Sequence, residues 1–378
     1  MRKIWITLKQ AALLITIMSL LLSCDLSNAG TPSPAPATAQ PAATAPPDIF
    51  ALTTTPATPL PVAAWLQIYF TDPSTPSARN YEGGPDSVLA KAIDAARLSV
   101  DVAAYDFNLW LLRDALIHAE QRGVVVRLVM ESDNMDNPEV QDLKDAAIPI
   151  RGDQREGLMH DKFMVIDRSQ VWTGSMNYTV GGTYNDNNDL ISILSPQVAA
   201  DFTHEFEEMF ADDRFGPDGL ADTPYPKLII SGTPVEVYFS PDDGVANRII
   251  ELINGAEESI HFLAYSFTSN DIGEVIMEKA QAGLQVSGVM DQSQVTAQGS
   301  EYDPFKQANL DVRLDGNGEG LMHHKLILID HQYVITGSYN FTASAENSND
   351  ENVVIIDNES VAFRYLDEFN KIYDASLP

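Results

Sequence analysis

The sequence predicts an α/β protein built from two pseudo-symmetric α/β sandwich lobes, repeated in tandem within one chain. The first observation is internal repetition: residues 99–107 match residues 259–267, and residues 123–130 match residues 283–290. The second is that helical spacing alternates with short apolar runs in each half. The third is a polar signature that stands in both halves with every internal spacing kept.

The amino-terminal segment predicts a secreted lipoprotein. Basic residues precede an apolar run at 11–22, which suits the core of a signal peptide and is short for a bilayer span. The run leads into Leu-Leu-Ser before Cys24, which resembles the bacterial lipoprotein cleavage motif. That resemblance implies removal of residues 1–23 and a diacylglyceryl group on Cys24. The mature protein would then be extracytoplasmic and lipid-anchored to the bacterial cell membrane.

Residues 24–62 form a linker rich in Pro, Ala and Thr. Such a segment cannot bury a core, and its prolines favour an extended tether. The tether would let the folded body stand off the membrane, and a simple spacer without function is the alternative. The two lobes are then expected at residues 63–229 and 230–378.

Each lobe is expected to contain strand, helix, strand, helix and strand, followed by a hairpin and a closing helix. In the first lobe, residues 86–97 and 108–122 carry helical spacing, and Gly123 ends the second helix. Residues 124–130 are apolar and β-branched, as in a strand covered on both faces. Helices of this length between strands imply right-handed crossovers, a largely parallel sheet and helices on both faces.

The polar signature lies where a buried strand should carry no polar residues. It reads H-x-K-x-x-x-x-D and, after six further residues, G-S-x-N. Side chains two apart on a strand point the same way, so each histidine shares a face with its lysine. The aspartate lies an odd number of residues further on, and we expect it to face away and to fix the fold behind the site. The first copy is His160, Lys162, Asp167, Ser175 and Asn177, and the second is His323, Lys325, Asp330, Ser338 and Asn340.

This duplicated pattern resembles the motif of the phospholipase D superfamily, over nearly all of residues 65–375. Two complete copies in register make a chance match far rarer than for one short motif. The resemblance implies the phospholipase D-like fold in both lobes. It also implies hydrolysis of a phosphodiester bond through a phosphohistidine intermediate, with no cofactor and no metal. Since both half-sites occur in one chain, a monomer is sufficient for one active site.

Hydrolysis of a phosphodiester needs a nucleophile, an acid for the leaving oxygen and compensation for charge on the equatorial oxygens. Two histidines can supply the first two, if one is neutral and the other protonated. By resemblance to the family, His160 is the nucleophile and His323 the general acid. The remaining polar groups of the motifs would bind the phosphate: Lys162, Lys325, Asn177, Asn340, Ser175 and Ser338.

Family members often carry a downstream acid that orients the histidine. In the second lobe Glu351 fits this place, whereas Asn188 stands at the equivalent position of the first lobe. Either the neighbouring Asp189 substitutes for the missing acid, or His160 lacks a charged orienting group. In the latter case the roles of the two histidines could be exchanged.

The other histidines and two tyrosines have plainer interpretations. Tyr105 and Tyr265 end repeated strands, where core packing is expected and a pocket wall is the alternative. Surface, packing or loop positions are expected for His118, His204, His261, His324 and His331.

Charge bears on the choice of substrate. The formal net charge is −31, and loss of residues 1–23, with three basic and no acidic residues, would leave −34. Nucleic-acid binding draws on Lys and Arg, and here the basic residues near the motifs alternate with acidic ones. We therefore expect hydrolysis of phospholipid headgroups at the membrane. The alternatives are a secreted non-specific endonuclease of the same superfamily and a lipid-anchored binding protein without catalysis.

Overall fold

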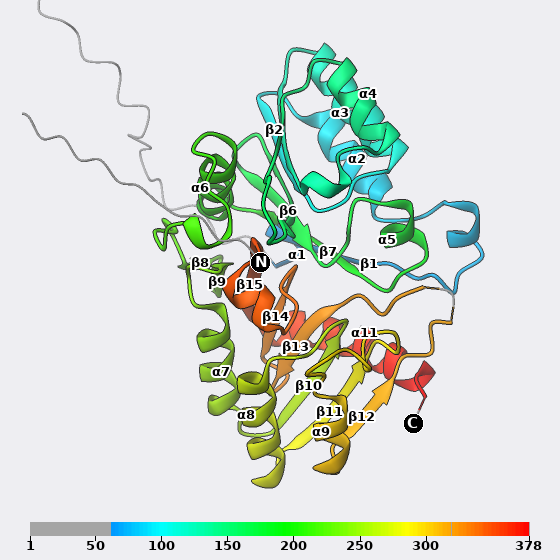
Figure 1. Cartoon of the computed structure of the whole chain (residues 1–378), viewed down its shortest axis with the longest axis vertical. Helices are drawn as coiled ribbons and strands as arrows, with labels where there is room; N and C mark the ends of the chain where they lie inside the picture. Colours follow the sequence, from blue (N-terminus) through cyan, green and yellow to red (C-terminus); the bar gives the residue numbers. More distant parts are fainter. Residues whose placement is uncertain (1–61, 319, 378) are drawn as a thin grey trace, which may run out of the picture. The chain divides into compact units, whose positions relative to one another are not determined.

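The structure is a computed structural model that describes residues 62–318 and 320–377, which belong to one compact unit (Figure 1). The predicted signal peptide, Cys24 and nearly all of the predicted linker lie outside the described residues. Within the described part, none of the helices has both the length and the apolar content needed to cross a bilayer.

The first lobe centres on a seven-stranded sheet. Its elements are α1 (Val62–Trp65), β1 (Leu66–Phe70), η1 (Ala78–Asn80), α2 (Asp86–Ala95), β2 (Ser99–Ala104), α3 (Trp110–Gln121), β3 (Val125–Met130), η2 (Ser132–Asn134), α4 (Pro138–Asp145), β4 (Ile150–Gly152), β5 (Lys162–Ile166), β6 (Gln170–Gly174), α5 (Val180–Tyr184), β7 (Asp189–Leu194) and α6 (Pro196–Phe210). The short helix η3 (Gly216–Asp218) follows in the segment that leads to the second lobe.

The second lobe centres on an eight-stranded sheet. Its elements are β8 (Lys227–Ile230), β9 (Thr233–Ser240), α7 (Val245–Gly255), β10 (Ser259–Ala264), α8 (Asn270–Gln281), β11 (Gln285–Met290), α9 (Tyr302–Gln307), β12 (Asp311–Leu314), β13 (Lys325–Ile329), β14 (Tyr333–Gly337), α10 (Ala343–Asn347), β15 (Glu351–Asp357) and α11 (Glu359–Ala375). Because β8 pairs with β9, the second sheet begins slightly before the predicted boundary at residue 230.

The predicted helices at 86–97 and 108–122 are confirmed by α2 and α3, and the strand at 124–130 by β3. Gly123 follows α3 with φ of 87°, the left-handed conformation that glycine adopts readily at a helix end. The predicted closing helix of the first lobe is α6. Its start is fixed by Ser195, whose side chain accepts a hydrogen bond from the Val198 N–H.

The strands run in the same order in both sheets, but the prediction of a largely parallel sheet is wrong. The first sheet has the order β1-β7-β6-β5-β2-β3-β4, and the second repeats it with β8 added at one edge. Only β2, β3 and β4, with their counterparts β10, β11 and β12, are parallel. The other pairs are antiparallel. The reason is the tight turn between β5 and β6, because a turn this short can join only antiparallel strands.

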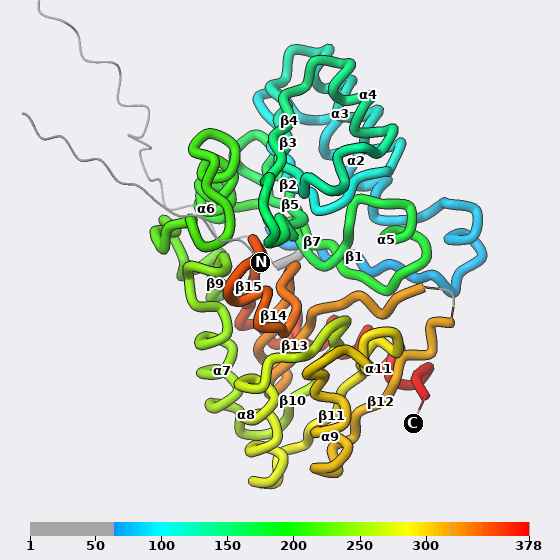
Figure 2. The backbone as a smooth tube through the Cα atoms, in the orientation of Figure 1, coloured from blue at the N-terminus to red at the C-terminus, as the bar shows by residue number. Residues whose placement is uncertain are grey.

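Helices cover both faces of each sheet, as predicted (Figure 1). Helices α2, α3 and α4 pack on the outer face of the first sheet, and α7, α8 and α9 on that of the second. Helices α6 and α11 lie between the sheets in a core that both lobes share. As a consequence, the segments β5–β7 and β13–β15 lie next to each other, although they are far apart in the sequence (Figure 2).

Candidate active site

The two histidines lie just before the first residues of β5 and β13, where the lobes meet. The His160 N–H donates to the Asp350 carbonyl oxygen at 3.0 Å, and the His323 N–H to the Asn187 carbonyl oxygen at 2.9 Å. Isolated β-bridges join the preceding methionine of each motif to the same partners. Each histidine is therefore held by the backbone of the opposite lobe.

The side chain of His160 also crosses the lobe boundary. Its Nδ1 lies 2.6 Å from Oε2 of Glu351, the first residue of β15, and Glu351 is fully buried. The other carboxylate oxygen accepts a hydrogen bond from Asn349 Nδ2 at 3.3 Å. The expectation that Glu351 orients the histidine of its own lobe is thus corrected, because β15 begins against the loop that carries His160.

His323 has the mirror arrangement with an amide in place of the acid. Its Nδ1 lies 2.9 Å from Asn188 Oδ1 and 3.1 Å from the Ser175 carbonyl oxygen. Asn188 Nδ2 donates to the Gly182 carbonyl oxygen at 2.9 Å, which fixes the amide orientation. Both neighbours of Nδ1 are therefore acceptors, so Nδ1 carries a proton.

Asp189 does not substitute for the missing acid. Its Oδ2 accepts from Thr336 Oγ1 at 2.7 Å and from the Tyr365 hydroxyl at 2.8 Å, and its Oδ1 accepts from the Ser175 N–H at 3.2 Å. Although burial raises the pKa of Asp189, hydrogen bonding and the nearby His324 lower it to about 2. Asp189 thus joins the lobes behind the site, and the histidine without a charged partner is His323.

The two lysines stand beside the histidines at the starts of their strands, each almost fully buried. Lys162 Nζ donates to the His160 carbonyl oxygen and lies 4.9 Å from the Tyr105 ring centroid. In the second lobe, Nζ of Lys325 donates to the His323 carbonyl oxygen at 2.8 Å and lies at the same distance from Tyr265.

Both tyrosine rings also contact the histidines, with centroids 4.8 Å apart for Tyr105 and His160 and 4.7 Å apart for Tyr265 and His323. The tyrosines are half-buried. The expectation of core packing is therefore wrong for them, because neither ring belongs to a described core cluster. The alternative of pocket walls stays a prediction, which their position at the carboxyl ends of β2 and β10, level with the start of the neighbouring β5 and β13, favours.

Burial and mutual repulsion weaken the positive charge of the paired histidines and lysines. Burial, followed by the ammonium groups of Lys162 and Lys325, lowers the pKa of both His160 and His323 well below the usual value. Burial also lowers the pKa of Lys162 to about 7 and that of Lys325 well below its usual value. Each lysine thus acts electrostatically on both histidines, including the histidine of the other lobe. A bound anion would favour their protonated forms.

The serines and asparagines of the G-S-x-N segments have different places. Ser175 and Ser338 are fully buried, and each hydroxyl accepts a backbone N–H from β7 or β15. The expectation that they bind phosphate is corrected, because their hydroxyls hold the strands that carry the orienting residues. Asn177 and Asn340 are half-buried, and within residues 62–318 and 320–377 no group hydrogen-bonds to their buried Oδ1 atoms. An amide donates only through Nδ2, so that group is the one that could bind a phosphate oxygen.

Asp167 and Asp330 lie in the turns after β5 and β13, away from the pocket. The Asp167 carboxylate accepts hydrogen bonds from the N–H groups of Arg97, Leu98 and Ser99 at 2.7–3.1 Å. The Asp330 carboxylate accepts three from the corresponding residues before β10 at 2.7–2.9 Å. Each therefore fastens the hairpin to the start of the central strand.

Sequence reasoning missed an ion pair that supports His160. The Arg155 guanidinium, in the loop before His160, contacts the Asp350 carboxylate and the Ser348 carbonyl oxygen of the second lobe. Because the Asp350 carbonyl oxygen accepts the His160 N–H, this pair holds the loop in register. His324 is fully buried, with Asp189 at 3.6 Å and Glu368 at 3.9 Å, in agreement with a packing role.

Two α/β lobes that present paired histidine–lysine motifs to each other define the phospholipase D superfamily, a class of phosphodiester-hydrolysing enzymes. The chain belongs to this superfamily, in the family described as "Cardiolipin synthase, PLD-like domain", whose model matches residues 89–210 and 249–373. These matches cover more than half of the chain and one stretch in each lobe.

Individual relatives agree with this assignment. The chain is 36% identical to a phospholipase D of Rickettsia prowazekii over 137 residues, which are 36% of this chain and 66% of that protein. It is 30% identical to a mitochondrial cardiolipin hydrolase of Chlamydomonas reinhardtii over 128 residues, 34% of this chain and 57% of that protein. The solved phosphatidylserine synthase of Haemophilus influenzae has the same fold, with a TM-score of 0.63 at 13% identity, over 84% of this chain and 88% of that chain.

Proposed function

We propose that this protein is a membrane-anchored phospholipase D that hydrolyses the headgroup phosphodiester bond of phospholipids through a phosphohistidine intermediate. The observation that carries the proposal is the crossed pairing of the site. His160 contacts Glu351 and His323 contacts Asn188, each across the lobe boundary. One phosphorus centre between the lobes would then be within reach of both imidazoles and both ammonium groups.

In the first step, Nε2 of His160 attacks phosphorus and forms a P–N bond. The bond from phosphorus to the headgroup oxygen breaks, and that oxygen takes a proton from Nε2 of His323. In the second step, the now neutral His323 removes a proton from water. The water oxygen bonds to phosphorus, the P–N bond breaks, and the phosphomonoester leaves.

The remaining side chains stabilise charge on the phosphoryl oxygens. The ammonium groups of Lys162 and Lys325 and the amides of Asn177 and Asn340 are suited to hold the non-bridging oxygens. Burial lowers the pKa of His323 and of the lysines, and the negative charge of a bound phosphodiester would raise these pKa values again. Substrate binding thus prepares the acid for the first step.

The asymmetry of the orienting groups supports His160 as the nucleophile. Attack on phosphorus places positive charge on the His160 ring, and the Glu351 carboxylate beside Nδ1 stabilises that charge. The Asn188 amide beside His323 carries no charge, so His323 gives up its proton more readily.

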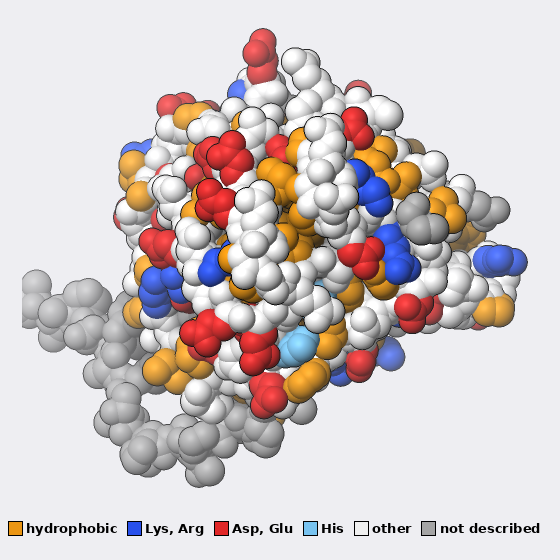
Figure 3. Space-filling model, turned by 90° about the horizontal axis from the view of Figure 1, so that it is seen from below, with side chains coloured by type: hydrophobic (Ala, Val, Ile, Leu, Met, Phe, Trp, Pro, Cys, Tyr) orange, Lys and Arg blue, Asp and Glu red, His pale blue; other side chains and the backbone are white. Residues whose placement is uncertain are grey.

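A phospholipid is favoured as substrate over a nucleic acid. The chain is strongly acidic, and relatives that match it are named phospholipase D and cardiolipin hydrolase. On the face drawn in Figure 3, the described basic side chains lie among acidic ones and form no continuous stripe. Nucleic-acid grooves need such a stripe to neutralise phosphates. A secreted endonuclease remains the second candidate.

The predicted lipid anchor fits this substrate, because a tethered enzyme meets its lipid within the membrane that holds it. The support for it is the signal-like segment and the lone Cys24 at the cleavage motif. Labelling cells with radioactive palmitate tests it. Wild-type protein should take up label in the membrane fraction and Cys24→Ser should not, and equal labelling of both would contradict the anchor.

The test of function uses the full-length protein in mixed detergent–phospholipid micelles that contain EDTA. Release of headgroup is expected, and it should fall by about a thousandfold in His160→Ala and in His323→Ala. His118→Gln is the matched control, because His118 is exposed on α3. Cleavage of DNA or RNA without any release of headgroup would contradict the assignment of phospholipid as the substrate. If neither nucleic acid nor phospholipid is hydrolysed, the alternative of a binding protein without catalysis would hold.

A substrate with a good leaving group assigns the two histidines. A p-nitrophenyl phosphodiester needs little help from an acid, so His323→Ala should release about one equivalent of p-nitrophenol in a burst and then stop at the phosphohistidine. His160→Ala should release none. The opposite pattern would exchange the roles.

A further inference from the structure

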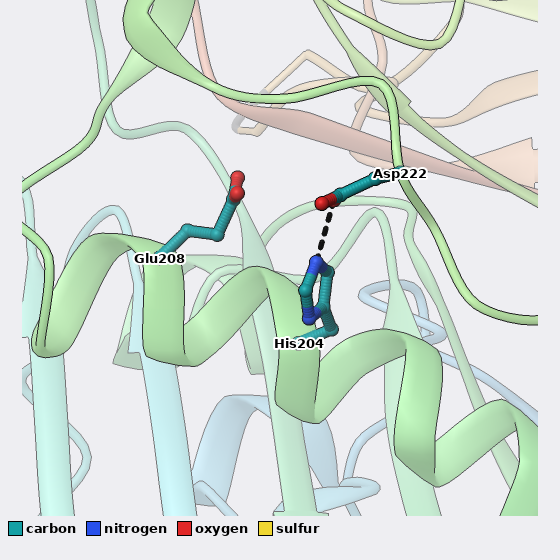
Figure 4. A group of neighbouring side chains, drawn as sticks. All are labelled: His204, Glu208 and Asp222. Carbon is teal, nitrogen blue, oxygen red and sulfur yellow. Dashed lines mark hydrogen bonds and ion pairs between the residues drawn. The ribbon is translucent and has the colours of Figure 1, made fainter.

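A group of side chains with metal-binding chemistry lies outside the paired motifs. His204 and Glu208 stand four residues apart on α6 and project from the same side of the helix (Figure 4). Asp222 reaches them from the segment that follows α6, with its Oδ1 2.6 Å from His204 Nε2. One potential ligand atom from each residue lies within 4.8 Å of the other two.

An unpartnered carboxylate oxygen lies beside this group. Asp201, one turn earlier on α6, is fully buried, and its Oδ1 accepts the Tyr225 N–H at 2.7 Å. Its Oδ2 is buried, and no described residue hydrogen-bonds to it. Asp201 stands three residues before His204, so the two side chains leave α6 on the same side. A buried oxygen of this kind is costly unless a cation or a bound water compensates it.

The surroundings carry more negative than positive charge. Asp243 is a further acidic residue close to the group, because its Oδ2 accepts a hydrogen bond at 2.7 Å from Oγ1 of Thr223, the residue after Asp222. Arg214 Nη1 lies 3.7 Å from Glu208 Oε1, at the long end of ion-pair distances. A cation placed among these groups would neutralise charge that the described residues leave uncompensated.

We propose that His204, Glu208 and Asp222 bind a divalent transition-metal cation of the Zn²⁺ type, which ties the segment between the lobes to α6. One imidazole nitrogen with two carboxylates is a ligand set that Zn²⁺ accepts, whereas Ca²⁺ and Mg²⁺ prefer oxygen alone. The metal would replace the contact between His204 Nε2 and Asp222 Oδ1. Asp201 would accept a hydrogen bond from a water on the metal.

The site would have a structural role that is separate from phosphodiester hydrolysis. The same segment already contacts α6 through the Leu220 N–H, which donates to Glu208 Oε2 at 3.3 Å. A metal would strengthen this attachment at the point where the chain passes from one lobe to the other. From the sequence, His204 was expected at the surface or in packing, and its four-residue spacing to Glu208 was the signal for a site.

The test is a titration of full-length protein, stripped with EDTA and dialysed, with Zn²⁺ in an isothermal calorimeter. About one Zn²⁺ per chain should bind, and the melting temperature should rise with Zn²⁺ by mass action. His204→Gln and Asp222→Asn should each weaken binding by at least about tenfold and remove the rise. Asp222→Asn is the safer variant, because Asp222 is exposed and its change should not disturb the core.

The control is Asp212→Asn, which removes the same charge from an exposed position nearby and should bind Zn²⁺ like the wild type. Absence of Zn²⁺ binding, or binding that His204→Gln and Asp222→Asn leave unchanged, would overturn the proposal. Headgroup release is measured in parallel with protein to which Zn²⁺ has been added back. Its absence there would contradict the proposed function, whereas the Zn²⁺ titration alone decides the metal site.

Discussion

At the scale of single residues, the two half-sites differ in the charge of one group. Glu351 and Asn188 occupy equivalent positions in the two lobes, and each accepts a hydrogen bond from the histidine of the other lobe. A carboxylate stabilises a charged imidazole more than an amide does. This difference is enough to give two otherwise similar histidines separate tasks.

The difference predicts opposite effects of two isosteric substitutions. Glu351→Gln keeps the shape but removes the charge, so kcat should fall by about a hundredfold or more. Asn188→Asp adds charge beside His323 and raises its pKa in the substrate complex. Since the acid must be protonated, the fall of kcat at high pH should then move to higher pH. The dependence of kcat on pH, measured for both variants, checks these two effects. If the fall of kcat at high pH stays at the wild-type pH in Asn188→Asp, His323 is not the acid.

The histidine and lysine pairs could be predicted from the sequence because a strand places alternate side chains on one face. Their partners could not. Periodicity tells which side of a strand a residue faces, but not which lobe's loops stand opposite, so Glu351 was assigned to His323. In the same way, the pattern could not show that the Ser175 and Ser338 hydroxyls are used by the neighbouring strands.

At the scale of elements, the turns after β5 and β13 decide both topology and alignment. Each turn contains an aspartate with positive φ whose carboxylate binds three backbone N–H groups before the central strand. The sequence indicated that these aspartates face away from the site. It could not indicate the antiparallel pairing, because apolar runs look alike in parallel strands and in buried antiparallel ones.

Asp330→Ala should therefore destabilise the fold without touching the chemistry. We expect a loss of about 1–2 kcal/mol in the free energy of unfolding, because three N–H groups lose their acceptor in a turn partly open to water. Urea unfolding measures it, with Asp212→Ala as the exposed control. A loss no larger than that of the control would contradict the role given to the turn.

The same variant should show a specific pH dependence. Although burial raises the pKa of Asp330, the backbone N–H groups of Ser259, Glu257 and Glu258 lower it below the usual value. The folded-state pKa is thus lower than the unfolded one, so the carboxylate stabilises the fold at neutral pH and ceases to do so as the pH falls through the folded-state pKa. The difference in the free energy of unfolding between wild type and Asp330→Ala should therefore become smaller below about pH 4.

At the scale of the whole molecule, the two lobes share one core. Phe202 of α6 is fully buried and packs with its ring centroid 5.0 Å from Phe163 of the first lobe and 5.0 Å from Phe239 of the second. The cluster around it continues into α11. Neither lobe can therefore bury its inner face alone.

Phe202→Ala should destabilise both lobes together, by about 3–5 kcal/mol. Calorimetry of the full-length protein should show one transition, moved to lower temperature as a whole. Two separate transitions, with only one of them moved, would show that the lobes fold independently and would contradict a shared core. Phe363→Ala is the matched control, because Phe363 is exposed on α11.

The crossed hydrogen bonds of His160 and His323 also bear on how such a chain can arise. A solitary lobe would carry an imidazole and a carboxylate that cannot meet each other, so it would gain a working centre only by associating face to face with its twin. Joining the twins in one gene would preserve that association and release them from being identical. The exchange of acid for amide between Glu351 and Asn188 is the divergence that such a fusion permits.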